Sequence, residues 1–471
     1  MKVSLIFTPI DVNPHNKSVS FRDEKLGFVP PTSLLIVAAL LEREGVEVDL
    51  IDMEAEELSY AATLERIRSF DPDLLGFTVT TWSFHSVIRW INKFKADSAI
   101  PVLVGGEHLR LYPHETMTHE SIDFCIIGEA ELPLPEFISA FREGRSFDGI
   151  KSLGFRKNGD IIIDRTIQLV DDINTLPFPA RHLIKNELYE NVLSRKKNFT
   201  AIITSRGCPF NCAFCTHNHQ KYRARSPENV VDEIELNLKS HGICDFDIYD
   251  STFTADERRV IRICEEIRRR KLNVGFTVRS RVDVVSCEMI DSLKSAGCHT
   301  ILYGIESSNP DILKMMNKQI SPEQVMKTVS YTKQCGIKVL GFFLFGFPGE
   351  TRQTMEDTVR FSLDLPLDYA LFSILLPMPD TEIYAYYREH GLGNYWAEYT
   401  LAHDESELEL IEFIGTEANR AETAQYALEA YRRFYFRPRT IWNRLKKLGS
   451  FGEFRKLLGG AIAIFTHDYR K

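Results

Sequence analysis

Three cysteines stand close together near the middle of the chain, in the stretch Cys208-Pro-Phe-Asn-Cys212-Ala-Phe-Cys215. Their spacing is C-x3-C-x2-C, and the four residues that follow include no further cysteine. Thiolates at this spacing can wrap one face of a [4Fe–4S] cube and ligate three of its irons. The fourth iron then has no protein ligand, and an open metal site is a place where a substrate or cofactor can bind.

A structural zinc site is the alternative for the same three cysteines. His217 and His219 follow the triplet directly, and either imidazole can complete a Cys3His tetrahedron around zinc. The spacing of the cysteines alone leaves both metals open, so the surrounding sequence has to distinguish them.

The motifs around the triplet resemble those of the radical S-adenosylmethionine (SAM) enzymes, and their order and spacing resemble the cobalamin-binding branch of that superfamily. The motifs are Thr204–Cys215, Arg223–Glu233, Asp247–Phe253, Arg281–Asp283, Tyr303–Ser307, Gly346–Thr351 and Pro377–Tyr384. Several motifs in one order are more specific than a cysteine triplet, so the resemblance favours the cluster over zinc. The chain departs from the pattern at Ser251, where aspartate is common, and at Asp380, where glycine is common.

The resemblance implies which cofactors the chain uses and what they do. The open iron would bind the amino nitrogen and carboxylate of SAM, and the reduced cluster would cleave SAM to a 5′-deoxyadenosyl radical. The protein would position the reactants and exclude water, while the cofactors carry the difficult chemistry. A reductant such as flavodoxin or ferredoxin would supply the electron.

The same resemblance assigns residues to these cofactors. Cys208, Cys212 and Cys215 are the expected cluster ligands. The expected SAM contacts are Glu306 to the ribose hydroxyls, Arg281 to the carboxylate, Asp250, and Gly346 through a close backbone approach. An ordinary salt bridge is the alternative for Glu306 and for Arg281, and a helix cap is the alternative for Asp250. No residue is assigned as a catalytic acid or base.

The leading function is a cobalamin-dependent methyltransferase that acts on an unactivated carbon of a small or lipid-like substrate. A radical cyclase, rearrangement or oxidative enzyme on the same scaffold, with or without cobalamin, is the alternative. Transfer-RNA methylthiotransferases usually carry more N-terminal cysteines, whereas Cys125 alone precedes the triplet here, so no nucleic-acid partner is expected. A cobalamin sensor or carrier would not need the triplet.

The first 145 residues alternate apolar strand patterns with helical patterns, which predicts a parallel α/β sheet. This layout resembles the Rossmann-like cobalamin-binding domain. Ligands of such sheets bind beyond the carboxyl ends of the strands, where Thr78, Gly105, Gly106 and Gly128 are expected to contact cobalamin. The Asp-x-His-x-x-Gly cobalt-ligand signature is absent, so a scaffold domain that binds no cobalamin is the alternative. For His108 we expect a corrin contact or a structural hydrogen bond rather than a cobalt bond.

The rest of the chain predicts three further regions. Residues 146–195 are expected to be a linker with a short hairpin. Residues 196–385 contain six strand patterns separated by helical patterns, which predicts a partial (β/α)6 barrel of the radical SAM type with its functional groups at the strand ends. Residues 386–471 are expected to form a helical C-terminal region.

Composition agrees with an α/β enzyme of several domains. The chain has 471 residues, of which 44% are hydrophobic and 26% charged, as in ordinary globular proteins. Its nine cysteines do not suggest a disulfide framework, because six of them are scattered singly. The first residues predict a strand rather than a signal peptide. No apolar run reaches the roughly 18 residues of a membrane span, so we expect a cytoplasmic protein.

A basic tail stands out against the net charge of −9. From Tyr431 to Lys471 the chain has eleven lysines and arginines but two acidic residues, a local charge of +9. Apolar residues are interleaved with these charges, a pattern typical of segments that lie in a membrane interface. We therefore expect peripheral contact with an anionic membrane, with packing of the apolar face on the barrel as the alternative.

Overall fold

A computed structural model describes residues 1–10, 27–196, 198–217 and 220–437. The contacts within the chain divide it into two compact units. The first unit comprises the described parts of 1–13, 28–189 and 393–409, and the second comprises those of 14–27, 190–392 and 410–471.

The first unit is built on a seven-stranded sheet with the strand order β2-β1-β3-β4-β5-β6-β7. Its strands are β1 (Lys2–Phe7), β2 (Glu47–Asp52), β3 (Leu74–Thr78), β4 (Val102–Gly105), β5 (Phe124–Ile126), β6 (Leu153–Lys157) and β7 (Asp160–Ile163). The first five strands are parallel to their neighbours, and β6 and β7 join antiparallel. The predicted parallel α/β sheet is therefore present.

Helices cover both faces of this sheet because the buried strands are apolar on both sides. They are α1 (Thr32–Arg43), α2 (Tyr60–Phe70), α3 (Phe84–Asp97), α4 (Glu107–Leu111), α5 (Pro113–Met117) and α6 (Pro133–Glu143). A further helix of this unit, α14 (Tyr395–Leu401), packs against α5. One core joins α1 and α6 to side chains such as Leu5 and Leu50 of the sheet. On the opposite face, the ring of Phe94 in α3 lies 6.1 Å from the ring of Phe77 in β3.

The structure differs from the expected domain boundaries at two places. The hairpin β6–β7, expected within a linker, extends the sheet of the first unit because the backbone of β6 pairs with that of β5. Residues 393–409, expected within a helical C-terminal region, belong to the first unit. The pattern of a single hairpin does not reveal which sheet edge it will join, so the sequence could not predict the place of β6–β7. A local helical pattern likewise does not reveal which unit a segment packs on, so the place of residues 393–409 could not be predicted either.

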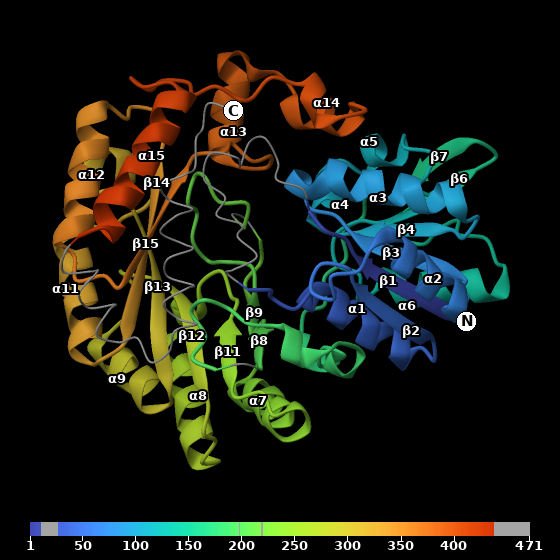
Figure 1. The fold of residues 1–471 in the computed structure, drawn as a ribbon, viewed down its shortest axis with the longest axis horizontal. Helices are drawn as coiled ribbons and strands as arrows, with labels where there is room; N and C mark the ends of the chain where they lie inside the picture. Colours follow the sequence, from blue (N-terminus) through green and yellow to red (C-terminus); the bar gives the residue numbers. More distant parts are fainter. Residues whose placement is uncertain (11–26, 197, 218–219, 438–471) are drawn as a thin grey trace. The chain divides into compact units, whose positions relative to one another are not determined.

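The second unit contains a six-stranded parallel sheet with the order β15-β14-β13-β12-β11-β8. Its strands are β8 (Phe199–Ile202), β11 (Asp245–Ile248), β12 (Gly275–Arg281), β13 (Cys298–Glu306), β14 (Lys338–Phe345) and β15 (Tyr369–Ile374). Two short strands, β9 (Ser205–Arg206) and β10 (Arg223–Ala224), pair separately. The curled sheet is visible in Figure 1 and confirms the predicted partial barrel.

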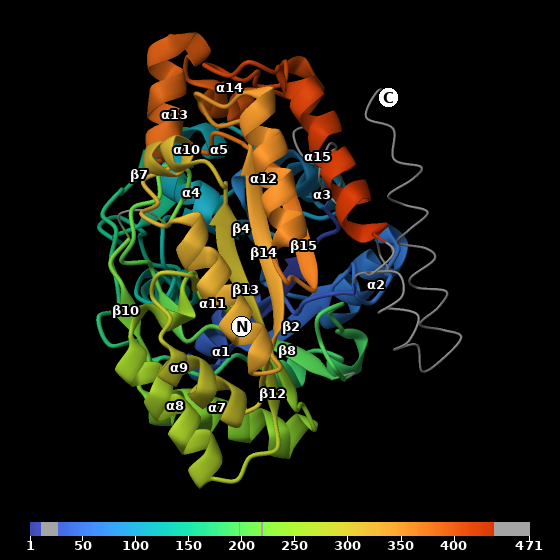
Figure 2. The same cartoon turned by 90° about the vertical axis from the view of Figure 1, so that its left-hand side faces the viewer.

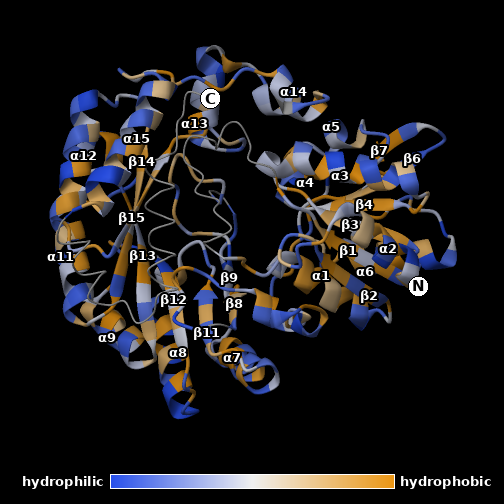
Figure 3. Ribbon diagram, in the orientation of Figure 1, coloured by the Kyte–Doolittle hydropathy of each residue, from blue (hydrophilic) through white to orange (hydrophobic). Residues whose placement is uncertain are grey.

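Most helices of the second unit pack on the outer face of its sheet. They are α7 (Pro227–His241), α8 (Glu257–Arg269), α9 (Cys287–Ser295), α10 (Pro310–Met315), α11 (Pro322–Gln334), α12 (Arg352–Asp364) and α15 (Arg420–Tyr435). The short helix α13 (Glu382–Tyr387) is instead bonded through the N–H of Ile383 to the carbonyl of Ala213. Figure 2 shows α11 and α12 in front of β13 and β14. Apolar residues run along the strands, whereas hydrophilic residues are frequent on the helices (Figure 3). Ser226, Ser286 and Ser321 cap α7, α9 and α11, each accepting a hydrogen bond from the backbone N–H three residues on, and serine is a preferred residue at this position.

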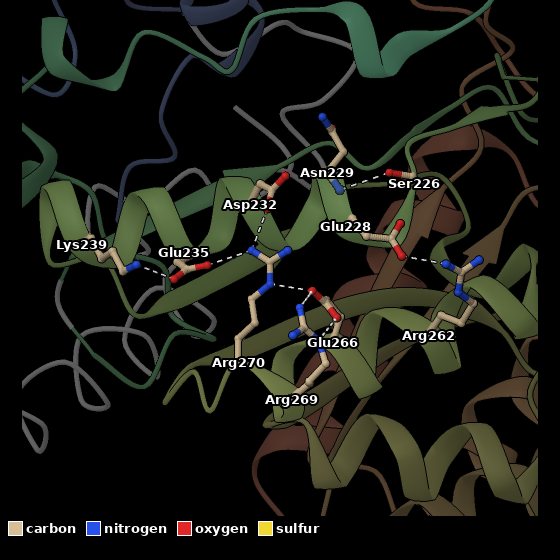
Figure 4. Close-up of polar contacts among 10 residues, drawn as sticks. All are labelled: Ser226, Glu228, Asn229, Asp232, Glu235, Lys239, Arg262, Glu266, Arg269 and Arg270. Atoms are coloured by element: carbon tan, nitrogen blue, oxygen red, sulfur yellow. Dashed lines mark hydrogen bonds and ion pairs between the residues drawn. The ribbon is translucent and has the colours of Figure 1, made fainter.

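A network of charged side chains links the neighbouring helices α7 and α8 (Figure 4). The guanidinium of Arg270 donates hydrogen bonds of 2.7–2.8 Å to Asp232, Glu235 and Glu266. Arg269 holds the same Glu266 with two further bonds. The paired arginines lower the pKa of Glu266 to about 2. This network stabilises the outer helical layer and lies on the side of the sheet away from the site described below.

None of the helices within the described residues is long and apolar enough to span a membrane. The expectation of a membrane-contacting basic tail falls mainly on residues 438–471, which lie outside the described part of the chain.

Three histidines attach α14 to the rest of the first unit. His85 and His119 each place Nε2 within 2.8 Å of a backbone carbonyl, of Tyr399 and Thr400 respectively. His108 is completely buried, with Nδ1 3.1 Å from the Thr81 hydroxyl and Nε2 3.2 Å from the Thr400 hydroxyl. Burial, together with the nearby His85 and His119, lowers the pKa of His108 to about 3.

This burial predicts a stability that depends on pH. The unfolded chain binds a proton at His108 near pH 6.5 whereas the folded chain resists it, so stability is present above pH 6.5 and is lost as the pH falls below it. From pH 7 to pH 5 we expect a loss of about 2 kcal/mol in the free energy of unfolding from this residue alone. Urea unfolding of the wild type and of His108→Gln at both pH values measures it.

The glutamine variant should lose less stability on acidification, because glutamine does not titrate. His182→Gln is the matched control, because His182 belongs to the same unit and its side chain is 58% exposed. The prediction fails if the His108 variant and the wild type lose stability equally between pH 7 and pH 5.

Candidate functional site

The cysteine triplet lies on a loop between the short strands β9 and β10 of the second unit. The loop leaves β9 through Gly207, whose φ is +73°. A Cβ atom at this position would lie 2.5 Å from the carbonyl oxygen of Lys221. Only glycine fits here without moving the backbone, so Gly207 fixes the direction in which the chain enters the triplet.

Asp250 anchors the strand end from which this loop departs. Its buried carboxylate accepts hydrogen bonds from the backbone N–H groups of Thr204 and Ser205 at 2.6 and 3.0 Å. The hydroxyls of the same two residues donate to its other oxygen at 2.5 and 2.7 Å. Asp250 was expected to contact SAM, with a helix cap as the alternative. The structure gives it four hydrogen bonds to the base of the cluster loop, and its expected contact with SAM stays a prediction.

The far side of the loop is tied to two helices. The N–H of Ala213 donates to the carbonyl of Met316 at the end of α10, and its carbonyl accepts from the N–H of Ile383 in α13, both at 3.0 Å. The side-chain amide of Asn317 donates to the carbonyl of Asn211 at 2.7 Å. The backbone between the cysteines is therefore held on several sides, which restricts where the thiols can lie.

The three thiols are half-buried, and two cations lie near Cys212. Burial raises the pKa of Cys212, whereas the charges of Lys318 and Arg281 act to lower it. Burial is also the main cause that raises the pKa of Cys215 to about 11; a backbone hydrogen bond at His217 acts against it, and the nearby Cys212 and Cys208 act with it. The cations favour the thiolate form, which is the form that ligates iron. These surroundings suit an anionic cluster.

Among the described residues, which omit His219, no three His, Cys, Asp or Glu side chains lie close enough to hold one metal ion. Three cysteines that ligate different irons of a cube need not converge on a single point.

Arg281 is the cation in direct contact with the triplet. Its Nη1 donates to Sγ of Cys212 at 3.2 Å, and its other nitrogens bond both oxygens of Asp283 at 2.9 and 2.7 Å. The guanidinium also lies over the ring of Phe210, 4.4 Å from its centre. The expected contact of Arg281 with the SAM carboxylate stays a prediction, while the structure shows the salt bridge that was its alternative.

Glu306 stands at the end of β13 in a strained conformation with φ +66°. The register of β13 against β14 shifts between Gly304 and Glu306, and this irregularity turns the carboxylate toward Lys318. The buried Lys318 donates to it at 2.7 Å. A Cβ on Gly304 would lie 2.7 Å from both charged groups, so this glycine makes room for the pair. Strain of this kind collects at functional sites, and the expected SAM contact of Glu306 stays a prediction.

Gly346 follows β14 with φ +90°, and a Cβ there would lie 2.4 Å from the ring of Phe413. The glycine is thus required by this close packing, whereas its expected approach to SAM stays a prediction. The N–H of Gly346 donates to Glu350 at 2.5 Å. Burial raises the pKa of Glu350 to about 8, and its Oε1 has no partner among the described residues.

In the first unit, the residues expected to contact cobalamin meet at the carboxyl ends of neighbouring strands. Thr78 pairs with Gly105 in register, and Gly106 forms a bridge with Gly128. A Cβ on Gly105 would meet nothing within 4 Å, so open space lies beside this backbone. A Cβ on Gly106 would instead lie 2.4 Å from the carbonyl of Val79. The expected contacts of Thr78, Gly105, Gly106 and Gly128 with cobalamin stay predictions.

His108 follows these glycines but cannot reach a ligand beyond the strand ends. Its ring is fully buried and its two nitrogens face two threonine hydroxyls. The structural hydrogen bond that was expected as one of its roles is confirmed, and a cobalt bond is excluded by burial.

Two residues at the site in the second unit, Lys318 and Glu350, were not predicted from the sequence. Lys318 lies outside every motif that was recognised, and its pairing with Glu306 comes from the turn after α10. Glu350 belongs to the motif Gly346–Thr351, but only the three-dimensional structure shows its carboxylate folding back onto the backbone of Gly346.

Comparisons with known proteins agree with this geometry. The family model of the radical SAM superfamily matches residues 202–362, and that of the B12 binding domain matches residues 23–138. An uncharacterized methyltransferase of Pyrococcus horikoshii is 32% identical over 88% of this chain and 89% of its own length. An anaerobic magnesium-protoporphyrin IX monomethyl ester cyclase of Rubrivivax gelatinosus is 27% identical over 77% of this chain and 67% of its own.

Solved structures share the fold. The radical SAM methyltransferase TsrM from Kitasatospora setae, solved with cobalamin and a [4Fe-4S] cluster bound, superimposes with a TM-score of 0.66 at 23% identity. The match covers 83% of this chain and 75% of TsrM. OxsB, a cobalamin-dependent SAM radical enzyme, gives a TM-score of 0.64 at 18% identity over 92% of this chain and 61% of its own. The chain belongs to the cobalamin-binding branch of the radical SAM superfamily.

Proposed function

We propose that this protein is a radical SAM methyltransferase that uses cobalamin to methylate an unactivated carbon of a small molecule. The observation that carries the proposal is the cysteine triplet beside Arg281 and Lys318 at the carboxyl end of a six-stranded parallel sheet. When bound, a [4Fe–4S] cluster with SAM supplies a 5′-deoxyadenosyl radical, and cobalamin supplies a carrier for the methyl group.

The residues of the second unit would hold and orient the cluster and SAM. Cys208, Cys212 and Cys215 would ligate three irons, on a loop whose position depends on Asp250. Arg281 would neutralise charge at the Cys212 sulfur. Glu306 would accept hydrogen bonds from SAM in place of part of its interaction with Lys318. Its carboxylate has further lone pairs available for these bonds.

The residues of the first unit would hold the corrin ring. The backbone at Gly105 offers the open space described above, and Thr78 lies beside it in the neighbouring strand. The cobalt would receive no histidine from this unit at the position of His108, because that ring is buried and hydrogen-bonded. The absence of the Asp-x-His-x-x-Gly signature agrees with this arrangement.

Methyl transfer is favoured over the cyclase alternative by the names of the relatives. The relative of 32% identity is named a methyltransferase. A cytidylyl-2-hydroxyethylphosphonate methyltransferase of Streptomyces wedmorensis is 24% identical over 75% of this chain. The cyclase of Rubrivivax gelatinosus shares the scaffold at lower identity than the first of these.

The cluster and the reaction are tested together in anaerobically reconstituted protein. Replacing Cys208, Cys212 and Cys215 by alanine should abolish the iron–sulfur absorption and the cleavage of SAM to 5′-deoxyadenosine, because no ligand for iron is left. Cys287→Ala is the matched control, because Cys287 is exposed and lies on the outer helix α9. With cell extract as the source of substrate, mass spectrometry should show a product heavier by one methyl group.

Stoichiometric zinc without iron–sulfur absorption would contradict the cluster. A product with no added methyl group, formed with consumption of SAM, would replace methyl transfer by the cyclase alternative.

Cobalamin binding is tested at Gly105. Purification with hydroxocobalamin should leave close to one corrinoid per chain, and Gly105→Phe should weaken its retention about tenfold or more, equivalent to about 1.4 kcal/mol, because the ring fills the open space. Gly105→Ala should have a smaller effect. Gly106 is unsuitable because any side chain there would strike the backbone of Val79. Wild-type protein that retains no corrinoid after desalting would make the first unit a scaffold.

Peripheral membrane contact is a separate proposal that the charge of residues 440–471 supports. Each basic residue near an anionic surface contributes roughly 1 kcal/mol, and salt screens the attraction. Anionic vesicles should therefore co-sediment the full chain at low salt but not at high salt, and should release the chain lacking residues 440–471. Equal recovery of both chains in the supernatant at low salt would contradict this contact.

A further inference from the structure

The strand β12 carries two arginines that are built into the fold in the same way. Arg279 and Arg281 are two residues apart, and each forms two hydrogen bonds to one aspartate, Asp247 and Asp283 respectively. Each guanidinium also lies over an aromatic ring. The pair of Arg281 and Asp283 contacts the cluster cysteine Cys212 through Arg281. The pair of Arg279 and Asp247 has no role in the cluster site.

Both arginines lie on the inner face of the sheet. Phe276 and Val278 of the same strand belong to the core against the outer helices, and alternate residues of a strand point to opposite faces. Arg279 and Arg281 therefore share the face turned away from those helices. Two residues along a strand span roughly 7 Å. One small molecule is therefore long enough to contact both Arg279 and Arg281, the residue that touches the cluster loop.

The ring over which Arg279 lies belongs to Tyr249. The guanidinium carbon is 3.9 Å from the centre of the ring. Tyr249 is 54% exposed, although it directly follows the buried strand β11. Its N–H donates to the carbonyl of Ile202 at 2.8 Å. The backbone of Tyr249 is thus fixed, one side of its ring is supported by a cation, and the remainder of the ring is open.

The supporting cation is itself held rigidly. The carboxylate of Asp247 is 3% exposed and bonds both terminal nitrogens of Arg279 at 2.6 and 3.0 Å. It also accepts from the hydroxyl of Thr277 at 2.8 Å. Burying such a charge pair costs desolvation energy, whereas burying an apolar pair does not. A rigid second layer behind an exposed group is typical of a site that orients a ligand.

The residues in register with Arg279 on β13, β14 and β15 form one level of the sheet, and they are apolar or aromatic. Arg279 is in register with Leu302 of β13, which is in register with Leu340 of β14, and Leu340 in turn pairs with Tyr369 of β15. The next level toward the strand ends carries Arg281 and Gly304. The level of Arg279 thus combines one open aromatic ring with an apolar floor and lies adjacent to the level of the cluster contact.

We propose that the stack of Tyr249 on Arg279 is the substrate-positioning platform of the enzyme, and that it takes a planar conjugated ring. Such a ring stacks on the open part of Tyr249, and its apolar remainder lies over Leu302 and Leu340. The inference rests on the proposed function, since it gives the substrate class for the same reaction. Tyr249 and Arg279 orient the ligand and take no part in bond making.

Binding of defined probes to the reconstituted full chain tests the platform. L-tryptophan and protoporphyrin IX serve as planar probes and palmitate as the non-planar probe, each measured by equilibrium dialysis. We expect the wild type to bind at least one planar probe. Tyr249→Ala should weaken that binding about three- to tenfold, the range that an aromatic pair contributes. Tyr249→Phe should retain it, because the ring remains, and Arg279→Met should weaken it.

Tyr60→Ala is the matched control. Lys93 lies 4.1 Å from the centre of the Tyr60 ring, so this change also removes a tyrosine under a cation, but in α2 of the first unit. It should leave probe binding unchanged. The proposal is overturned if the wild type binds neither planar probe, if Tyr249→Ala binds them as tightly as the wild type, or if only palmitate depends on Tyr249. SAM cleavage by the wild type without substrate is measured in parallel. If the wild type does not cleave SAM, the proposed function is refuted independently of the platform.

Discussion

The buried carboxylate of Asp250 is the interaction on which the cluster site depends. It joins the end of β11 to the end of β8 by four hydrogen bonds to Thr204 and Ser205. An unpaired buried carboxylate would be costly, so the two strand ends are locked together. The cysteine triplet begins at Cys208, three residues after Ser205 and directly after the turn at Gly207. The position of the thiols thus depends on a carboxylate whose four hydrogen bonds go to the base of the loop.

A second constraint is the alternation of side chains along β12. One face of this strand carries the apolar core against the outer helices, and the other presents Arg279 and Arg281 at successive levels. Each arginine is fixed by an aspartate and an aromatic ring, so little conformational entropy remains to be lost when a ligand binds. The same strand therefore links a residue at the cluster to a residue at the inferred substrate platform.

Much of this could be predicted from the sequence because it depends on local patterns. The cysteine spacing, the serine caps at Ser226, Ser286 and Ser321, and the six barrel strands all appear in short windows. The pairing of Lys318 with Glu306 could not be predicted, because it depends on a register shift in β13 and on the missing side chain of Gly304. The attachment of residues 393–409 to the first unit depends on buried histidines far away in the sequence, which no local pattern reveals.

The proposed function requires a redox-active cluster with an open iron that binds SAM in the second unit. Electron paramagnetic resonance of the anaerobically reconstituted and reduced protein, recorded with and without SAM, tests this requirement. We expect the signal of a reduced [4Fe–4S] cluster, and the shape of the signal should change when SAM is added, because SAM occupies the iron that lacks a cysteine. A cluster signal that SAM leaves unchanged, or the absence of a cluster signal in protein that contains iron and sulfide, would contradict it.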